Sequence, residues 1–225
     1  MSKIVLAMLF VAVLAITSAD LAAFPLGISV KGGIGLGYYS MDALNDNLRI
    51  ASQQTGAFFD DLSKGINVAL QGRVWFLGRY GVHLGYQHYW GESSAASGGL
   101  EYTYKTPADV YAIGGVLNIL SFPVLFDINA GANWCHVRSI FGTNVRTTSF
   151  LQEYKGNDNG FELYAEVVTN FVRPVDIGIQ FGYRGLTVKS LENKFKEEAR
   201  FPISETKVEL EYSGVFFFFT AGIRL

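Results

Sequence analysis

Strict alternation of apolar and polar side chains is the feature that most restricts the fold of this chain. The stretch 176–185, DIGIQFGYRG, has isoleucine or an aromatic residue at every second position, with glycine, glutamine or a charged residue between them. Successive side chains of a β-strand point to opposite faces, so a period of two indicates a strand between two unlike environments. A soluble barrel turns its apolar face inward, whereas a membrane barrel turns that face toward lipid.

Eight segments of this kind follow one another along the chain. They run over residues 26–40, 65–76, 81–91, 109–120, 124–138, 160–172, 175–187 and 213–225. Short connections alternate with long ones, and the long ones span 40–64, 92–108, 139–159 and 188–212. Membrane barrels have tight turns at one end and large loops at the other. The sequence therefore predicts an all-β fold, an eight-stranded antiparallel up-and-down transmembrane β-barrel formed by residues 20–225.

The composition of the polar face favours the membrane orientation. A solvated outer face would be dense in lysine, glutamate, threonine and serine, whereas glycine weakens a strand. An eight-stranded barrel is only just wide enough for its own side chains, so small groups suit its lumen. A soluble lipocalin-like ligand-binding barrel is the less favoured alternative. The small and neutral residues of the polar face are Gly33, Gly35, Gly37, Gly85, Gly131, Gly178, Gly182, Gln71, Gln87, Asn129 and Asn133.

Aromatic residues on the apolar face form two bands with smaller aliphatic residues between them. Such bands are typical of the interfacial girdles of membrane barrels. The band toward the long loops contains Tyr38, Tyr86, Trp90, Tyr111, Trp134, Phe161 and Tyr183, and the band toward the short turns contains Phe76, Phe126 and Phe171.

The first residues have the pattern of an export signal. Lys3 precedes an apolar run, residues 4–16, and small residues follow up to Ala19. This run is too short to span a bilayer as a helix, so we expect a signal peptide over residues 1–19, with an uncleaved anchor as the alternative. Cys135 is the single cysteine, which excludes an internal disulfide, and a net charge of −2 gives no basic excess for nucleic acid.

The last segment, SGVFFFFTAGIRL, resembles the C-terminal strand of bacterial outer-membrane proteins. Its outward face would carry Phe217, Phe219, Ile223 and Leu225, although that family usually ends in phenylalanine. With the opening GGIGLGYYS, the mature chain resembles the small porin-like barrels of the OmpA, OmpX and OmpW type. The resemblance implies a place in the bacterial outer membrane, contact with outer-membrane lipid and lipopolysaccharide, and recognition of the C-terminal strand by the outer-membrane assembly machinery.

Ionisable side chains are expected to meet inside the barrel. Charges in a membrane protein pair with one another or meet water. Folding the sixth and seventh segments about their short turn puts Glu162 opposite Arg184 and Glu166 opposite Gln180. The network is either a structural filling of the lumen or an ion path or gate. Its members are Lys31, Arg73, His83, Asp127, Glu162, Glu166, Asp176 and Arg184, and the bulky Tyr39, Trp75, Tyr89 and Tyr164 share the lumen face.

No enzymatic, cofactor or metal site is expected. Some barrels of this size are lipid-A deacylases with a His-x-Ser pair facing lipid, but Arg138 stands two residues after His136, and Trp90 two after His88. A hydrolase needs its nucleophile within reach of its base. Three histidines and one cysteine, scattered along the chain, do not make a metal site.

The long loops leave several roles open. Residues 41–54 have helical spacing of apolar residues, with Ser40 as the expected N-cap. Phe58 and Phe59 would pack over the barrel mouth, enter the outer leaflet or bind a ligand. The last loop carries both charge signs, as a solvated surface or a ligand-binding surface would. The expected function is a structural, surface-binding or restricted small-solute role, and a lipid-A-modifying enzyme is the alternative.

Overall fold

The computed structural model describes residues 26–122, 125–145, 150–169, 174–201 and 205–225. The expected signal peptide, residues 1–19, and Phe171 of the expected aromatic band lie outside these ranges. Within them, no helix is long and apolar enough to cross a membrane.

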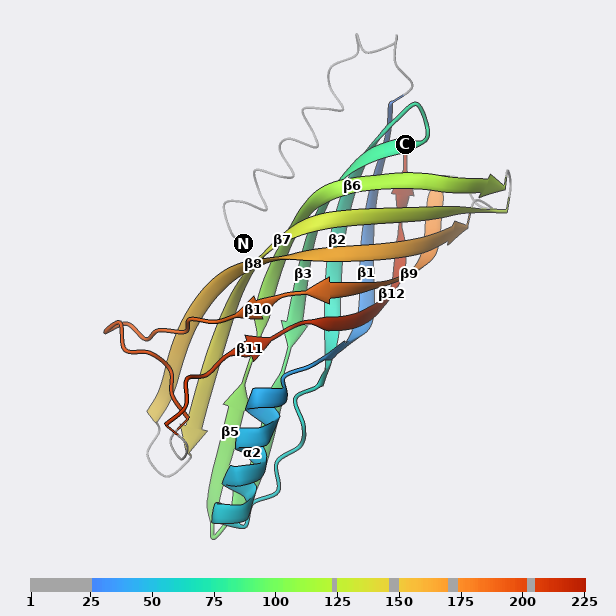
Figure 1. The fold of residues 1–225 in the computed structure, drawn as a ribbon. Helices are drawn as coiled ribbons and strands as arrows, with labels where there is room; N and C mark the ends of the chain where they lie inside the picture. The colour runs from blue at the N-terminus through green and yellow to red at the C-terminus, as the bar shows by residue number, and fades with distance from the viewer. Residues whose placement is uncertain (1–25, 123–124, 146–149, 170–173, 202–204) are drawn as a thin grey trace.

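Eight antiparallel strands form a closed ring, which confirms the expected fold class (Figure 1). Each strand pairs with the next in chain order, and the first pairs with the last, from Ser29 opposite Arg224 to Tyr39 opposite Gly214. Closure leaves no open edge within the ring. The barrel strands are β1 (Leu26–Tyr39), β2 (Lys64–Phe76), β3 (Tyr80–Trp90), β6 (Ala108–Phe122), β7 (Phe126–Val145), β8 (Phe150–Thr169), β9 (Val175–Gly185) and β12 (Gly214–Arg224).

The two faces of the barrel have the membrane orientation. Charged side chains such as Arg73, Glu162 and Arg184 are at most 2% exposed and point into the lumen, whereas Ile34 and Phe219 on the outer face are each 59% exposed. A soluble protein does not bury its charges and expose its isoleucines in this way. The barrel therefore spans a membrane, and its outer face meets lipid.

Aromatic residues border the lipid-facing surface at both ends, as expected. Tyr38, Trp90 and Trp134 are about half exposed near the long loops, and Phe76 is exposed near the short turns. Rings from neighbouring strands meet in these bands, with Tyr86 and Tyr111 centroids 5.5 Å apart and those of Phe122 and Phe126 4.8 Å apart. Amphipathic rings prefer the boundary between hydrocarbon and headgroups, so the bands mark the limits of the bilayer.

Glycines on the lumen face make room for rings on adjacent strands. Gly131 lies opposite Tyr164 in the β7–β8 ladder, and a Cβ at Gly131 would collide with the Tyr164 ring. These glycines are therefore part of the packing and do not line an open channel. The pairs are Gly35 with Phe218, Gly131 with Tyr164, and Gly182 with Phe216.

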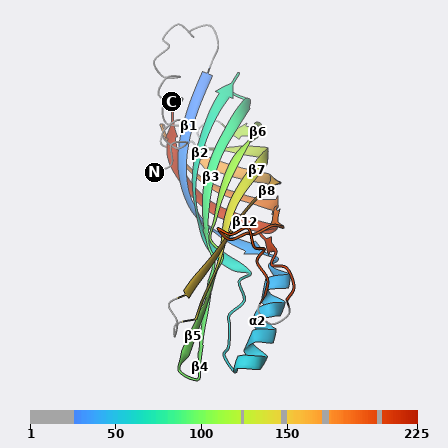
Figure 2. The ribbon, with the colours of Figure 1, turned by 90° about the vertical axis from the view of Figure 1, so that its left-hand side faces the viewer.

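The long connections contain more regular structure than the sequence indicated. Residues 139–159 were expected as a loop, but β7 continues to Val145 and β8 begins at Phe150, and these two strands of 20 residues each pair with one another. The second connection forms a hairpin of β4 (Glu92–Ser97) and β5 (Leu100–Lys105), and β5 pairs with the C-terminal end of β7. In Figures 1 and 2, this hairpin extends beyond the barrel at the end opposite the C-terminus.

The first connection contains the expected helix, α2 (Asp42–Thr55), beside the hairpin (Figure 2). The expected N-cap at Ser40 is wrong, because Met41 holds that position in a left-handed conformation and no side chain caps the helix. Phe58 and Phe59, expected to act alike, differ. The Phe59 ring packs 5.3 Å from that of Tyr104, whereas Phe58 is 91% exposed.

These connections pack into one body, which we call the cap, consisting of the described parts of residues 40–63, 92–107, 139–159 and 186–213. It includes the two-residue strands β10 (Thr187–Val188) and β11 (Leu210–Glu211), which pair with each other. Its buried apolar core is continuous with the barrel mouth, so the cap is an ordered extension of the barrel. Core members from the cap include Met41, Leu44, Leu48, Leu62, Phe141, Leu186, Val188, Leu191, Ala199, Phe201, Val208 and Leu210.

The glycine and ring packing is testable by a substitution and its rescue. We expect Gly131→Val to destabilise the barrel by about 1–3 kcal/mol, the usual cost of overpacking, because the added methyls meet the Tyr164 ring. Adding Tyr164→Ala should return part of that loss. The measurement is unfolding by urea in detergent. The folded fraction is read from a gel, on which folded and heat-unfolded barrels migrate differently.

Gly115→Val is the matched control. Gly115 lies on the outer face of β6, and nothing stands within 4 Å of a Cβ placed there. Its stability should stay within about 0.5 kcal/mol of the parent protein. Equal losses for Gly115→Val and Gly131→Val would contradict the packing described here.

Candidate functional site

Glu166 is the centre of the ion-paired group in the half of the lumen nearer the short turns. Its carboxylate accepts from the Arg73 guanidinium, from Lys31 Nζ at 3.3 Å and from Asn129 Nδ2 at 3.2 Å. Lys31 Nζ also lies 3.6 Å from Asp176. These partners come from β1, β2, β7 and β9, so the group crosses the lumen and does not follow one wall.

Arg224 is a member of this network that the sequence reasoning missed. Its guanidinium donates to Asp127 at 2.7 Å and to Asp176 at 3.1 Å. Strand parity could have found it, because Thr220, Gly222 and Arg224 alternate with the lipid-facing residues of β12. With Arg224 included, the described lumen face pairs four basic side chains with four carboxylates.

Glu162 and Arg184 form a second ion pair nearer the long loops. They lie opposite each other in the β8–β9 ladder, in the register expected from the short turn, and Arg184 Nη2 is 2.8 Å from Glu162 Oε2. Gln87 Nε2 and Asn133 Nδ2 each donate to the same carboxylate at 3.0 Å. The Glu162 carboxylate is fully buried, and side chains from β3, β7 and β9 bind it.

His83 does not join the ion pairs, although it was expected among them. Its Nδ1 lies 2.8 Å from the hydroxyl of Tyr164, and the two rings meet edge to face with centroids 5.3 Å apart. Phe216 and Phe218 also point inward and are at most 2% exposed. In the run of four phenylalanines, residues 216–219, Phe216 and Phe218 therefore face the lumen, and Phe217 and Phe219 face lipid.

Three tyrosines close the barrel mouth at its junction with the cap. The ring centroids of Tyr39 and Tyr89 are 4.8 Å apart, and Tyr212 lies 5.4 Å from Tyr89 and 6.1 Å from Tyr39. The Tyr212 hydroxyl donates to the Thr106 carbonyl oxygen at 3.0 Å and lies 2.6 Å from Ser139 Oγ. Burial raises the pKa of the Tyr212 phenol well above its ordinary value, so it stays a donor.

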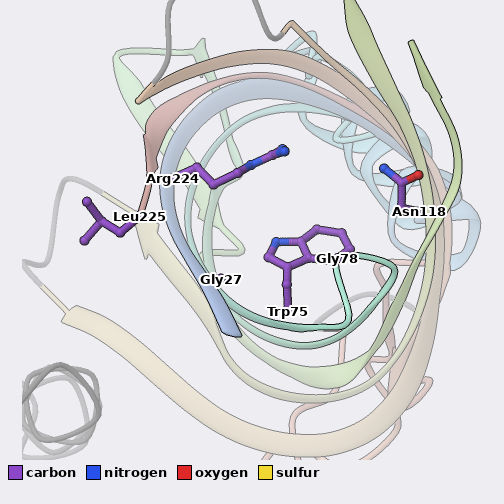
Figure 3. A pocket seen from close by; sticks show the side chains of 6 residues that line it. All are labelled: Gly27, Trp75, Gly78, Asn118, Arg224 and Leu225. Carbon is purple, nitrogen blue, oxygen red and sulfur yellow. The ribbon is translucent and has the colours of Figure 1, made fainter. Parts of the chain in front are cut away.

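A cavity of about 120 Å³ opens at the short-turn end of the lumen. Figure 3 shows the Trp75 indole and the Arg224 guanidinium pointing into the ring of strands, with Asn118 on the opposite wall. The cavity is smaller than the roughly 300–1,000 Å³ of typical ligand sites, and the ion pairs of Arg224 lie directly beside it. It is a vestibule to the filled lumen.

The residues expected to signal assembly lie where the sequence placed them. Phe217, Phe219, Ile223 and Leu225 lie on the outer face of β12 and of the residue that follows it. On the outer wall, His88 Nδ1 lies 2.7 Å from Asp109 and His136 Nδ1 lies 2.9 Å from Asn159. Among the described residues, no group of three or more histidine, cysteine or acidic side chains has the arrangement of a metal site.

Comparison with known proteins supports the fold. The sequence matches no family model, and no curated protein matches it. The structure is similar to a major outer-membrane protein of Thermus thermophilus, with a TM-score of 0.53, 11% identity, and coverage of 89% of this chain and 99% of that one. It is also similar to Ail of Yersinia pestis, solved in complex with the heparin analogue sucrose octasulfate, with a TM-score of 0.51, 11% identity and coverage of 89% and 99%.

The fold is therefore that of the eight-stranded outer-membrane barrels. Its apolar outer band and paired lumen charges place the protein in the bacterial outer membrane, where long loops face outward and short turns face the periplasm. The cap is then extracellular, and the vestibule is periplasmic.

The Glu162–Arg184 pair allows a direct test of the lumen network. Replacing Arg184 by Leu leaves a buried carboxylate without its cation, and we expect a loss of about 3–5 kcal/mol in the free energy of unfolding. The double variant Glu162→Gln with Arg184→Leu should recover part of this loss. Both are measured by urea unfolding in detergent.

The exposed pair of Glu92 and Lys105 on the hairpin serves as the control. Its atoms lie 3.1 Å apart, but both side chains are about half exposed. The same double-mutant cycle there should give a coupling of about 1 kcal/mol or less. Additive losses at Glu162 and Arg184 would show that these two residues do not interact.

Proposed function

We propose that this protein is a non-conducting outer-membrane anchor that displays an ordered extracellular cap for binding. The observation that carries the proposal is the continuous filling of the barrel from the vestibule to the cap. Ion pairs occupy the periplasmic half, the Glu162 group and inward rings follow, and the tyrosines Tyr39, Tyr89 and Tyr212 adjoin the apolar core of the cap. Eight strands leave little further width for a solute.

The network in the lumen then has a structural role. Its basic groups and carboxylates are matched in number and paired across the lumen, which leaves little net field to select an ion. A narrow pore is the competing function. Opening such a pore would require these ion pairs to rearrange. The fixed cross-strand amide contacts, such as Gln71 Nε2 to Gln180 Oε1 at 2.6 Å, favour a static plug.

One point on the cap combines an exposed aromatic ring with two basic residues. Phe195, 71% exposed, stands between Lys194 and Lys196 at the tip of the last connection, and Lys194 Nζ lies 4.9 Å from its ring centroid. Exposed aromatic and basic residues on ordered loops are common anchors of interfaces. Because Ail was solved with a heparin analogue, a sulfated sugar is a reasonable first probe for this tip.

Planar-bilayer recordings test the anchor against the pore. The purified, heat-modifiable barrel should give no steady unitary current, because its lumen and mouth are filled. A variant with Tyr164, Phe216 and Phe218 changed to Ala, together with the three mouth tyrosines, should give small currents if it still folds. Steady, large porin-like currents from the parent protein would refute the plugged lumen.

The alternative of a lipid-A-modifying enzyme has a separate test. The hydrogen-bonded partners of the outward histidines are Asp109 and Asn159, not a serine hydroxyl. We propose that the protein is not an enzyme and expect lipid A from cells with and without it to have the same masses. A shift equal to one acyl chain would establish the enzymatic function.

Export and assembly complete the proposal. Residues 1–19 would be removed as a signal peptide, and the outward residues Phe217, Phe219, Ile223 and Leu225 would be read by the outer-membrane assembly machinery. The aligned apolar face of β12, already paired on both edges in the finished barrel, supports this role. No cofactor, metal or nucleic acid is part of the proposed function.

A further inference from the structure

Two adjacent rows of polar side chains cross the outer wall of β3, β6, β7 and β8. Cross-strand pairing places them side by side, directly above a lipid-facing row of Leu84, Ile113, Trp134 and Phe161. This height is the boundary between hydrocarbon and headgroups. The first row is Tyr86, Tyr111, His136 and Asn159, and the second is His88, Asp109, Arg138 and Asn157.

Arg138 is the cation of these rows, and its guanidinium has spare donors. It lies over the Tyr111 ring, 5.8 Å from the centroid, and is exposed on the outer wall. Asp109 stands opposite it in the ladder, but that carboxylate accepts from the Tyr86 hydroxyl and lies beside His88 Nδ1, both at 2.7 Å. Within the described part of the chain, Arg138 makes neither a hydrogen bond nor an ion pair.

A guanidinium at this height needs an anion that the bilayer can supply. Arginine presents a planar fork of donors that matches a phosphate, and the Tyr111 hydroxyl and His136 imidazole lie in the neighbouring row. The position faces lipid, so the phosphate belongs to a lipid headgroup and not to a solute in the lumen. Membrane proteins collect anionic lipids through such basic groups at the interface.

The neighbouring groups favour a sugar headgroup. The Asp109 carboxylate accepts hydrogen bonds and would repel a bare phosphate, whereas the amides of Asn157 and Asn159 can both donate to and accept from sugar hydroxyls. The rings of Trp134 and His136 lie stacked with centroids 6.2 Å apart, and Tyr86 and Tyr111 form a second ring pair. Rings beside hydroxyl acceptors suit the apolar faces and edges of a sugar.

We propose that the outer wall of β3, β6 and β7 binds the phosphorylated sugar headgroup of an outer-leaflet glycolipid, with Arg138 contacting the phosphate. Lys64 is a second outward cation, but it lies in the row of Tyr38 and Val215, which are a tyrosine and an aliphatic residue. On the other side of the barrel, the outward residues at the end of β9 and the start of β12 are Tyr183 and Val215, which offer no cation. This inference does not depend on whether the barrel conducts.

Lipid binding to the folded full barrel in non-ionic detergent tests the proposal. Diphosphoryl lipid A and phosphatidylglycerol are titrated separately, and bound lipid is counted by native mass spectrometry. The parent protein should retain lipid A at concentrations at least tenfold below those needed for phosphatidylglycerol. Arg138→Gln should weaken lipid A binding about tenfold or more, the usual effect of losing a charge-assisted hydrogen bond.

Lys64→Gln is the matched control, because Lys64 Nζ also lies 5.8 Å from a tyrosine ring centroid, that of Tyr38, in a row that continues to Val215 and not to the histidine and asparagines of the site. It should bind lipid A as the parent protein does. Tyr111→Phe keeps the ring under Arg138 and should cause a smaller, several-fold loss.

Three results would overturn the proposal: equal binding by Arg138→Gln and the parent, equal losses in Arg138→Gln and Lys64→Gln, or equal retention of phosphatidylglycerol and lipid A. Heat-dependent gel migration verifies that each variant is folded. If Arg138→Gln does not fold, Tyr111→Phe decides, and unchanged binding in that variant refutes the site.

Discussion

Closing eight strands into a ring sets the width of the lumen, and every inward side chain must fit within that width. Large rings are accommodated only where a neighbouring strand has no side chain, as Tyr164 is opposite Gly131. Charges are accommodated only in pairs, because a lone buried ion loses its hydration without compensation. The glycines, rings and ion pairs of this lumen are thus consequences of one geometric limit.

The same limit connects the barrel to its cap. The filled lumen ends at Tyr39, Tyr89 and Tyr212, whose rings belong to the apolar core that continues into the cap. Since Tyr212 also binds Thr106 and Ser139, the mouth joins three of the four long connections. Because the cap shares its apolar core with these tyrosines, the barrel orders the cap, and the cap does not need a separate core of its own.

Period-two alternation was enough to predict the barrel, because lipid and lumen are unlike environments along every membrane strand. The Glu162–Arg184 register followed from the short turn between β8 and β9. The extensions of β7 and β8 were missed because a sheet beyond the membrane no longer separates lipid from lumen, and its sequence reads as a polar loop. Parity placed Phe217 and Phe219 outward, but Phe216 and Phe218 were not counted among the lumen residues, because phenylalanine does not mark a polar face. Arg224 was missed because it adjoins the terminal residue.

The strands of the barrel differ in length around its circumference. The longest strands, β7 and β8, connect the cap with the polar rows around Arg138 on the outer wall. The extended strands β7 and β8 carry the sheet that supports the cap, and β7 also pairs with the hairpin through β5. The polar rows around Arg138 lie on these same strands where they leave the hydrocarbon. A sheet that leaves the hydrocarbon needs polar side chains at that height, since headgroups surround it there. A lipid headgroup held there would contact the wall from which the cap extends, so lipid contact and cap orientation share one structural element.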